Sequence, residues 1–314
     1  MIEILTVTVN PALDLSTEAR AVIPDEKLRC TAPQVHPGGG GVNVSRAIAN
    51  LGGSSHTLVA FGGATGAELV QLLKEEGLSP ESLGVDHPTR QSTTVFDNAT
   101  GLQYRFMMPG PPWTDADCKT ARDAIMANVV PGAMVIPSGS LPPGMSEDFF
   151  LDLAPEIRAQ GGRMILDTSG DALRHAAAGQ SELFVLRMDL AEARELSGKS
   201  LVGIDEIAAL ARELRDRTGA EIIMIAAGAQ GTVIDCDAWC GLTRPPVVMP
   251  RSKVGAGDSF IGAFALSLTR GDDPVTACAW GTAAAASAVT TDGTELCSRS
   301  ATERYFKEVT NTQL

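Results

Sequence analysis

A short glycine-rich stretch, KVGAGDSFIGAF at residues 253–264, constrains this chain more than any other. Gly255, Ala256 and Gly257 carry almost no side chain that would keep an anion away from the backbone. Apolar residues then recur at helical spacing, so a helix begins here and its positive dipole end points at one spot. Asp258 lies in the first turn, where it suits a base that takes a proton from a hydroxyl attacking phosphorus. The plain alternative is that Asp258 only caps the helix and the glycines only form a tight turn.

Composition narrows the function classes. The 314 residues suffice for one large α/β domain or two small ones, and no linker divides the chain, so we expect a single domain over 1–314. A formal net charge of −13 argues against nucleic acid or an anionic membrane as partner. Without a signal pattern or a long apolar run, and with six scattered cysteines that read as reduced thiols, we expect a cytoplasmic protein.

A second glycine run, PGGGGVNVSRAIANLGG at residues 37–53, predicts another ligand contact. Gly39, Gly40 and their neighbours permit positive φ angles and a close approach of backbone to ligand. A helix follows at once, and Asn43 lies in its exposed first turn. The Asn43 amide can both donate and accept hydrogen bonds, which suits a polyhydroxyl ligand. The alternative is that Asn43 only caps the helix.

The order of the remaining segments predicts a mainly parallel sheet flanked by helices. A helix is expected at 65–76 and an alanine-rich one at 274–290. Ser138 and Ser140 follow a predicted strand, at the sheet edge where α/β proteins bind ligands. Strands are expected at 2–9, 57–63, 133–137, 163–167, 182–186 and 221–226.

Two segments break this rhythm and predict a small β-sheet lid. Residues 88–108 alternate like an antiparallel hairpin with its turn at 98–101, and residues 20–36 are irregular and strand-like. The lid is expected to form from roughly 12–36 and 88–108. In an acidic chain, the cations in these segments indicate a site that collects a phosphate, although a solvated loop is the alternative. The cations are Lys27, Arg29, Arg90 and Arg105.

With both glycine stretches considered, the chain resembles the PfkB family of the ribokinase superfamily, nearly end to end. The first stretch is similar to the family's sugar-binding signature and VGAGDSFIGAF to its catalytic signature. Within the family the likeness is strongest to the minor bacterial 6-phosphofructokinases, through KLRCTAP (27–33), GGATG (62–66) and SGSLPPG (138–144). A P-loop is absent, and Phe260 stands where a dinucleotide-binding motif requires its third glycine.

The resemblance implies a ribokinase-like α/β fold whose lid pairs with a partner lid in a homodimer. It implies ATP with Mg²⁺ as phosphoryl donor, and K⁺ near 252–254 and 288–293. Asp258 would be the base acting on the sugar 1-hydroxyl, and the amides of 255–257 would stabilise the transferring phosphoryl group. The acceptor, a hexose phosphate, would be held by Asp14, Gly39, Gly40, Asn43, Ser138, Ser140, Lys27, Arg29, Arg90 and Arg105.

The donor side departs from the family pattern. Where the family has Lys-Pro-Asn-x-x-Glu, this chain has Arg187, Met188 and Asp189, and only Glu192 is kept. Asp189 and Glu192 are the expected Mg²⁺ ligands, and Arg187 replaces a lysine of different shape and hydration. The other residues expected to contact the nucleotide are Ala226, Gly228, Gly231 and Lys253, the last at a position where relatives have a small hydroxyl residue.

The two glycine stretches, the cations of the predicted lid and the family resemblance together favour a kinase that transfers the ATP γ-phosphate to fructose 6-phosphate. Tagatose-6-phosphate kinase and 1-phosphofructokinase activities are alternatives within the same substrate class. The altered donor residues also leave open a weakly active sugar-phosphate sensor. A kinase for an unphosphorylated sugar or nucleoside is the third possibility, but such a substrate has no need of the cations.

Overall fold

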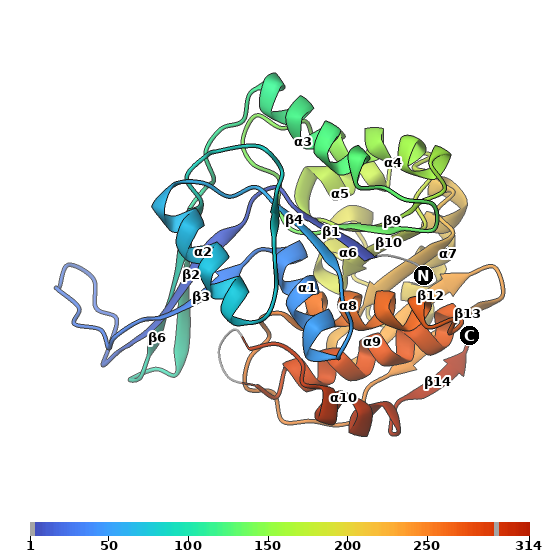
Figure 1. Cartoon of the computed structure of the whole chain (residues 1–314). Helices are drawn as coiled ribbons and strands as arrows, with labels where there is room; N and C mark the ends of the chain where they lie inside the picture. Colours follow the sequence, from blue (N-terminus) through green and yellow to red (C-terminus); the bar gives the residue numbers. More distant parts are fainter. Residues whose placement is uncertain (1–3, 292–294) are drawn as a thin grey trace.

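A ten-stranded sheet forms the centre of the computed structural model, which describes residues 4–291 and 295–314 (Figure 1). From β5 to β11 the neighbouring strands are parallel, and β12, β13 and β14 add an antiparallel edge. In spatial order the strands are β14 (Thr310–Gln313), β13 (Trp239–Arg244), β12 (Thr232–Cys236), β11 (Ile222–Ala226), β10 (Val185–Asp189), β9 (Arg163–Asp167), β8 (Met134–Pro137), β1 (Ile4–Thr8), β4 (His56–Val59) and β5 (Glu81–Ser82).

Helices cover both faces of this sheet, as the alternating segments predict. One apolar cluster joins the sheet to α3 (Asp115–Ala127), α4 (Phe149–Ala159), α5 (Gly170–Ala176), α6 (Leu190–Ser197) and α7 (Ile204–Thr218). The second joins it to α1 (Gly40–Asn50), α8 (Ala256–Thr269) and α9 (Pro274–Ala288), with α10 (Arg299–Phe306) packed on α9. Because the neighbouring strands from β5 to β11 are parallel, their carboxyl ends lie along one edge of the sheet, which is where ligands bind in such folds.

A separate four-stranded sheet extends to one side of the main body (Figure 1). It contains β3 (Gln34–Gly38), β2 (Ala12–Ala19), β6 (Arg90–Asp97) and β7 (Leu102–Met107), in that order. Apolar side chains of α2 (Gly63–Glu75) pack against Leu13 of β2 and so attach this sheet to the core. The strands come from the two segments whose patterns broke the α/β rhythm, and the hairpin turn lies at 98–101 as predicted.

Several predicted boundaries are wrong. The strand expected at 182–186 is β10, Val185–Asp189, because the charged Arg187 is accommodated inside the sheet by an ion pair with Asp167. The strand expected at 57–63 already ends at Val59. The antiparallel strands β12 to β14 were not predicted. Among the described residues, no helix combines the length and the apolar composition needed to cross a bilayer.

Candidate active site

The turn before α8 has the open geometry expected of an anion site. Gly255 is the N-cap residue with a φ of 71°, in the left-handed region that favours glycine, and a Cβ there would lie 2.3 Å from the Leu296 side chain. Among the described residues, no side chain caps this helix. The first amides of α8 are therefore available for a negatively charged ligand.

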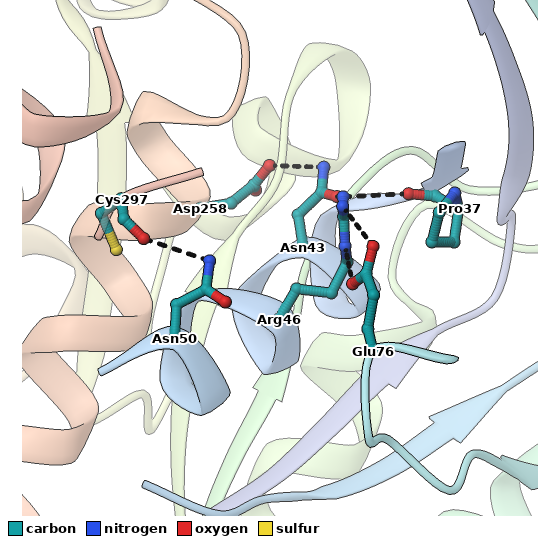
Figure 2. Close-up of polar contacts among 7 residues, drawn as sticks. All are labelled: Pro37, Asn43, Arg46, Asn50, Glu76, Asp258 and Cys297. Carbon is teal, nitrogen blue, oxygen red and sulfur yellow. Dashed lines mark hydrogen bonds and ion pairs between the residues drawn. The ribbon is translucent and has the colours of Figure 1, made fainter. Parts of the chain in front are cut away.

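Asp258 does not cap its own helix; it contacts another one. The Nδ2 atom of Asn43, in the first turn of α1, donates a hydrogen bond to Oδ2 of Asp258 at 2.9 Å (Figure 2). The helices approach closely because Gly262 has no side chain: a Cβ there would lie 3.0 Å from the carbonyl oxygen of Val44. Two residues 215 positions apart, each predicted from its own glycine stretch, thus meet at one point.

The environment of Asp258 suits a general base. Burial is the main reason why the pKa of its carboxyl rises to about 7, and the negative charge of Asp167 raises it further. The hydrogen bond from Asn43 and the positive charges of Arg187 and Arg46 act in the opposite direction. A carboxyl group whose pKa lies near neutrality is well matched to proton transfer at physiological pH.

Asp167 was missed by sequence reasoning, although it ends a predicted strand at the ligand-binding edge of the sheet. Nη1 of Arg187, on the neighbouring β10, donates to Oδ1 of Asp167 at 2.9 Å. The Ser138 hydroxyl donates to the other carboxylate oxygen at 3.3 Å. Arg187 also borders the anion site, because a Cβ at Gly257 would lie 3.0 Å from its Nη1. The Nε atom of Arg187 is buried without a hydrogen-bond partner among the described residues.

The small sheet presents a second charged group. Asp14 of β2 lies in register with Ser92, two residues after Arg90 on β6. Burial raises the pKa of Asp14, while the charges of Arg90 and Arg105 act to lower it. Arg90 is held in place by hydrogen bonds to the carbonyl oxygens of Asn10 and Met108 and to the Ser92 hydroxyl. Asp14 and the two arginines are thus brought together, as expected.

Glycines 38 to 40 allow the small sheet and α1 to meet the central sheet. A Cβ at Gly38 would lie 2.1 Å from Oδ2 of Asp14, and one at Gly40 would lie 2.3 Å from the Ser138 hydroxyl. Gly39 has a φ of 119°. Ser140 accepts a hydrogen bond from Asn10. These three glycines thus let Asp14 and Ser138 lie close to the chain that leads into α1.

The pfkB family carbohydrate kinase model matches residues 8–301. The chain belongs to this family. A 6-phosphofructokinase isozyme 2 of Mycobacterium tuberculosis is 38% identical over 304 residues, which are 97% of this chain and 89% of the relative. The family and fold expected from the sequence are therefore confirmed.

Two solved structures share the fold. Phosphofructokinase-2 from Escherichia coli in complex with fructose-6-phosphate has a TM-score of 0.90 and 35% identity, covering 98% of this chain and 99% of that one. Ribokinase from Thermotoga maritima has a TM-score of 0.77 and 20% identity, covering 98% and 100%. The second likeness supports the fold alone.

Two predicted phosphate ligands of this pfkB-family kinase are not brought to the site. Lys27 and Arg29 are exposed on the loop between β2 and β3, which extends away from the main body (Figure 1). Sequence reasoning grouped them with Arg90 because they are cations in the same small sheet. Within one chain, the arginines whose charges act on Asp14 are Arg90, Arg105 and Arg46.

The predicted metal ligands of the kinase cap a helix. Oδ1 of Asp189 accepts from the Glu192 amide at 2.9 Å, and Oε2 of Glu192 accepts from the Asp189 amide at 2.7 Å. Among the described residues, no three or more His, Cys, Asp or Glu side chains form a metal-binding group. Mg²⁺ binds through one or two carboxylates and substrate phosphates, so the remaining oxygens of this pair fit an ion that arrives with a nucleotide.

One of the other predicted nucleotide contacts, Ala226, lies beside this pair. Ala226, at the end of β11, is in register with Asp189, and a short 3₁₀ turn at Gly228–Gln230 follows it. Gly231 has a structural reason of its own, because a Cβ there would lie 2.3 Å from the Thr243 carbonyl oxygen. Lys253 is exposed two residues before the open turn of α8.

The segments expected to hold K⁺ also lie together. The amides of Arg251 and Ser252 donate to the carbonyl oxygen of Val289 at 2.7 and 3.3 Å. The end of the second segment, residues 292 and 293, lies outside the described residues.

Proposed function

We propose that this chain is an ATP-dependent 6-phosphofructokinase that transfers the γ-phosphoryl group of ATP to the 1-hydroxyl of fructose 6-phosphate. The observation that carries the proposal is the contact between Asn43 and Asp258, since it involves a partly buried carboxylate in the first turn of α8, whose N-terminus no described side chain caps. The similarity to a 6-phosphofructokinase isozyme 2 and to a fructose-6-phosphate complex supports the substrate.

The proposed reaction needs few groups from the protein. The Asp258 carboxylate takes the proton of the sugar 1-hydroxyl. The hydroxyl oxygen bonds to the γ-phosphorus of ATP as the bond between that phosphorus and the β,γ-bridging oxygen breaks, and ADP leaves. The amides of Gly255, Ala256 and Gly257 stabilise the charge on the transferring phosphoryl group. One such donor is typically worth roughly 3–4 kcal/mol in the transition state, and a positioned base contributes ~10²–10⁴-fold.

The acceptor phosphate is assigned to the arginines of the small sheet. Arg90 and Arg105 lie close enough to Asp14 to influence its pKa, so this face carries two cations around one carboxylate. In the proposed complex the arginines hold the 6-phosphate, and Asp14, Gly39, Gly40, Asn43, Ser138 and Ser140 contact the sugar. An unphosphorylated sugar would have no phosphate for these cations to hold.

The donor is assigned to the opposite side of the site. Arg187 is proposed to contact ATP phosphates, because its guanidinium borders Gly257 and its Nε has no partner among the described residues. Asp189 and Glu192 would hold Mg²⁺, which supplies charge neutralisation on the phosphates when it is bound. Ala226, Gly228, Gly231 and Lys253 are proposed to line the nucleotide side, and K⁺ is proposed near 252–254.

We also propose that the small sheet pairs with its copy in a homodimer of a cytoplasmic enzyme. Its outer strand β7 is exposed along its whole length and carries large apolar side chains. Phe106 and Met107 are 51% and 55% exposed, which favours burial against a second apolar surface. Such pairing would also give the loop that carries Lys27 and Arg29 a protein neighbour.

A panel of hexose phosphates with ATP, scored by kcat/KM, tests the substrate. Fructose 6-phosphate is expected to exceed tagatose 6-phosphate, fructose 1-phosphate and free fructose. No turnover of any phosphosugar, with several nucleotides and pyrophosphate at high Mg²⁺, would favour a sensor. The variant Arg90→Ala is expected to raise the KM for fructose 6-phosphate strongly, and an unchanged KM would contradict the assignment of the acceptor phosphate.

A further inference from the structure

Arg46, one helical turn after Asn43, donates hydrogen bonds to three residues close to the proposed base, Asp258 (Figure 2). Although charged, it is only 8% exposed. Its Nη1 donates to Oδ1 of Asn43 at 3.3 Å and to the carbonyl oxygen of Pro37 at 3.2 Å. Its Nε and Nη2 donate to the two carboxylate oxygens of Glu76 at 2.5 and 2.7 Å.

These contacts determine which way the Asn43 amide faces. An asparagine amide has one acceptor oxygen and one donor nitrogen of similar size, so its orientation depends on its neighbours. Arginine has only donors, so the side of Asn43 that faces Arg46 must be the oxygen. The nitrogen then faces Asp258 and donates to its carboxylate.

The anchors of Arg46 come from two other parts of the fold. Pro37 belongs to β3 of the small sheet, and Glu76 directly follows α2. The bidentate ion pair with Glu76 fixes the orientation of the Arg46 guanidinium, and it also offsets much of the Arg46 charge. Besides its remaining charge, Arg46 contributes a directional hydrogen bond to Asn43.

We propose that Arg46 is a positioning residue, which holds the Asn43 amide so that its nitrogen donates to the Asp258 carboxylate. The inference rests on the proposed function, in which Asp258 is the base. It adds a dependence of the base on the small sheet and α2, through Pro37 and Glu76.

Burial and the charged groups around Asp258 determine its pKa, which the pH dependence of kcat/KM can report. Asp167 at the end of β9 raises the pKa of Asp258, whereas Arg187 on β10 and Arg46 and Asn43 on α1 lower it. In Arg46→Met the amide loses the donor that fixes it and can turn its oxygen to Asp258, where two acceptors repel. The acid limb of kcat/KM is then expected to move up by about one pH unit, since a hydrogen bond to a charged group is lost.

The test compares pH profiles of kcat/KM for fructose 6-phosphate in wild type, Arg46→Met, Asn43→Ala and the double variant. The substrates' own phosphates titrate identically in all four, so differences between profiles belong to the protein. If Arg46 acts through Asn43, Arg46→Met shifts the limb further in the wild-type background than in Asn43→Ala, where only the loss of the Arg46 charge remains. An equal shift in both backgrounds would overturn the proposal, because the charge of Arg46 would then act directly.

A matched control separates positioning from stability. Arg122→Met breaks another arginine–glutamate pair, between Arg122 of α3 and Glu156 of α4, remote from Asp258 in sequence and in fold. It is expected to leave the profile in place. A loss of activity in Arg46→Met that is equal at every pH would overturn the proposal, since that is the signature of a structural role. If Arg46→Met fails to fold, two other variants give the comparison. Arg46→Lys, whose ammonium group has donors only, is expected to shift the limb less than Arg46→Gln, whose amide can also present an acceptor to Asn43.

Failure of this inference is distinguishable from failure of the proposed function. If Asp258→Asn retains wild-type turnover, the base assignment itself is wrong. If Asp258→Asn loses turnover while the profile of Arg46→Met coincides with that of wild type, only the role of Arg46 is wrong.

Discussion

Two helix N-termini in this molecule use acidic residues in opposite ways. The N-terminus of α6 is closed, because Asp189 and Glu192 accept each other's amides in a capping box. The N-terminus of α8 begins at Gly255, and the acidic residue in its first turn, Asp258, bonds to Asn43 of α1 instead. A carboxylate that leaves the amides of its own helix free makes room for a ligand, whereas one that caps stabilises the helix.

The two turns should therefore respond differently to substitution. Capping contributes to folding, so changes at α6 are expected to cost stability. Partial burial disfavours the ionised form of Asp258, so this residue is expected to lower the stability of the fold at neutral pH. The same burial raises its pKa towards the value that suits a general base. Arg187 lies between the turns, paired with Asp167 and adjacent to Gly257.

The largest expected loss of stability follows removal of this shared cation. Arg187→Met leaves the largely buried Asp167 carboxylate without its ion pair, close to the charge of Asp258. Breaking a buried pair from one side costs about 3–5 kcal/mol. Urea denaturation measures the loss, and Arg187→Lys, which keeps the charge, should lose less. A fall in the free energy of unfolding of less than about 1 kcal/mol would contradict this account, because the ion pair of Arg187 with Asp167 would then contribute little to stability.

At the open turn, loss of the proposed base should stabilise the protein. The pKa of Asp258 rises from its usual 3.8 to about 7, so the folded state binds this proton more tightly than the unfolded state does. Its contribution to stability is present below pH 4 and is lost as pH rises through 7. Asp258→Asn should thus be more stable than wild type at pH 8, by at most about 4 kcal/mol, and this advantage should shrink towards pH 4.

Denaturation midpoints of both proteins between pH 5 and 8 provide the measurement. A gain that does not change with pH would point to packing and not to the buried charge.

At the capped N-terminus of α6 the expected change in stability is the smallest of the three, and it is a loss, whereas Asp258→Asn is expected to give a gain. Asp189→Ala removes the N-cap acceptor and should cost ~1 kcal/mol. Asp189→Asn is the matched control, since asparagine caps as well as aspartate but lacks the charge. If Asp189 also serves Mg²⁺, Asp189→Asn should keep stability while requiring more Mg²⁺ for half-maximal turnover. Equal loss of stability in both variants would contradict the capping role.

The sequence predicted the open turn because its signals are local. Glycines at 255 and 257, apolar residues at helical spacing and an acidic residue in the first turn all lie within fifteen positions. The same holds for the glycine run before α1 and for Asn43. Their meeting followed only from the family resemblance and the order of strands.

The rest of the site depends on which strands become neighbours. Asp167 becomes relevant because β9 lies beside β10, and no local pattern marks it. Arg46 is linked to Glu76, thirty positions away, through packing of α1 and α2 on the small sheet. Asp189 and Glu192 were taken as metal ligands alone, although an aspartate three residues before a glutamate also predicts a capping box.

The most direct test of the account is the turnover of Asp258→Asn at saturating ATP and fructose 6-phosphate, with sugar-phosphate binding measured by calorimetry on the same sample. The account predicts that kcat falls at least ~100-fold while fructose 6-phosphate still binds. Turnover close to that of wild type would contradict it, because the carboxylate would then be only a partly buried charge between two helices.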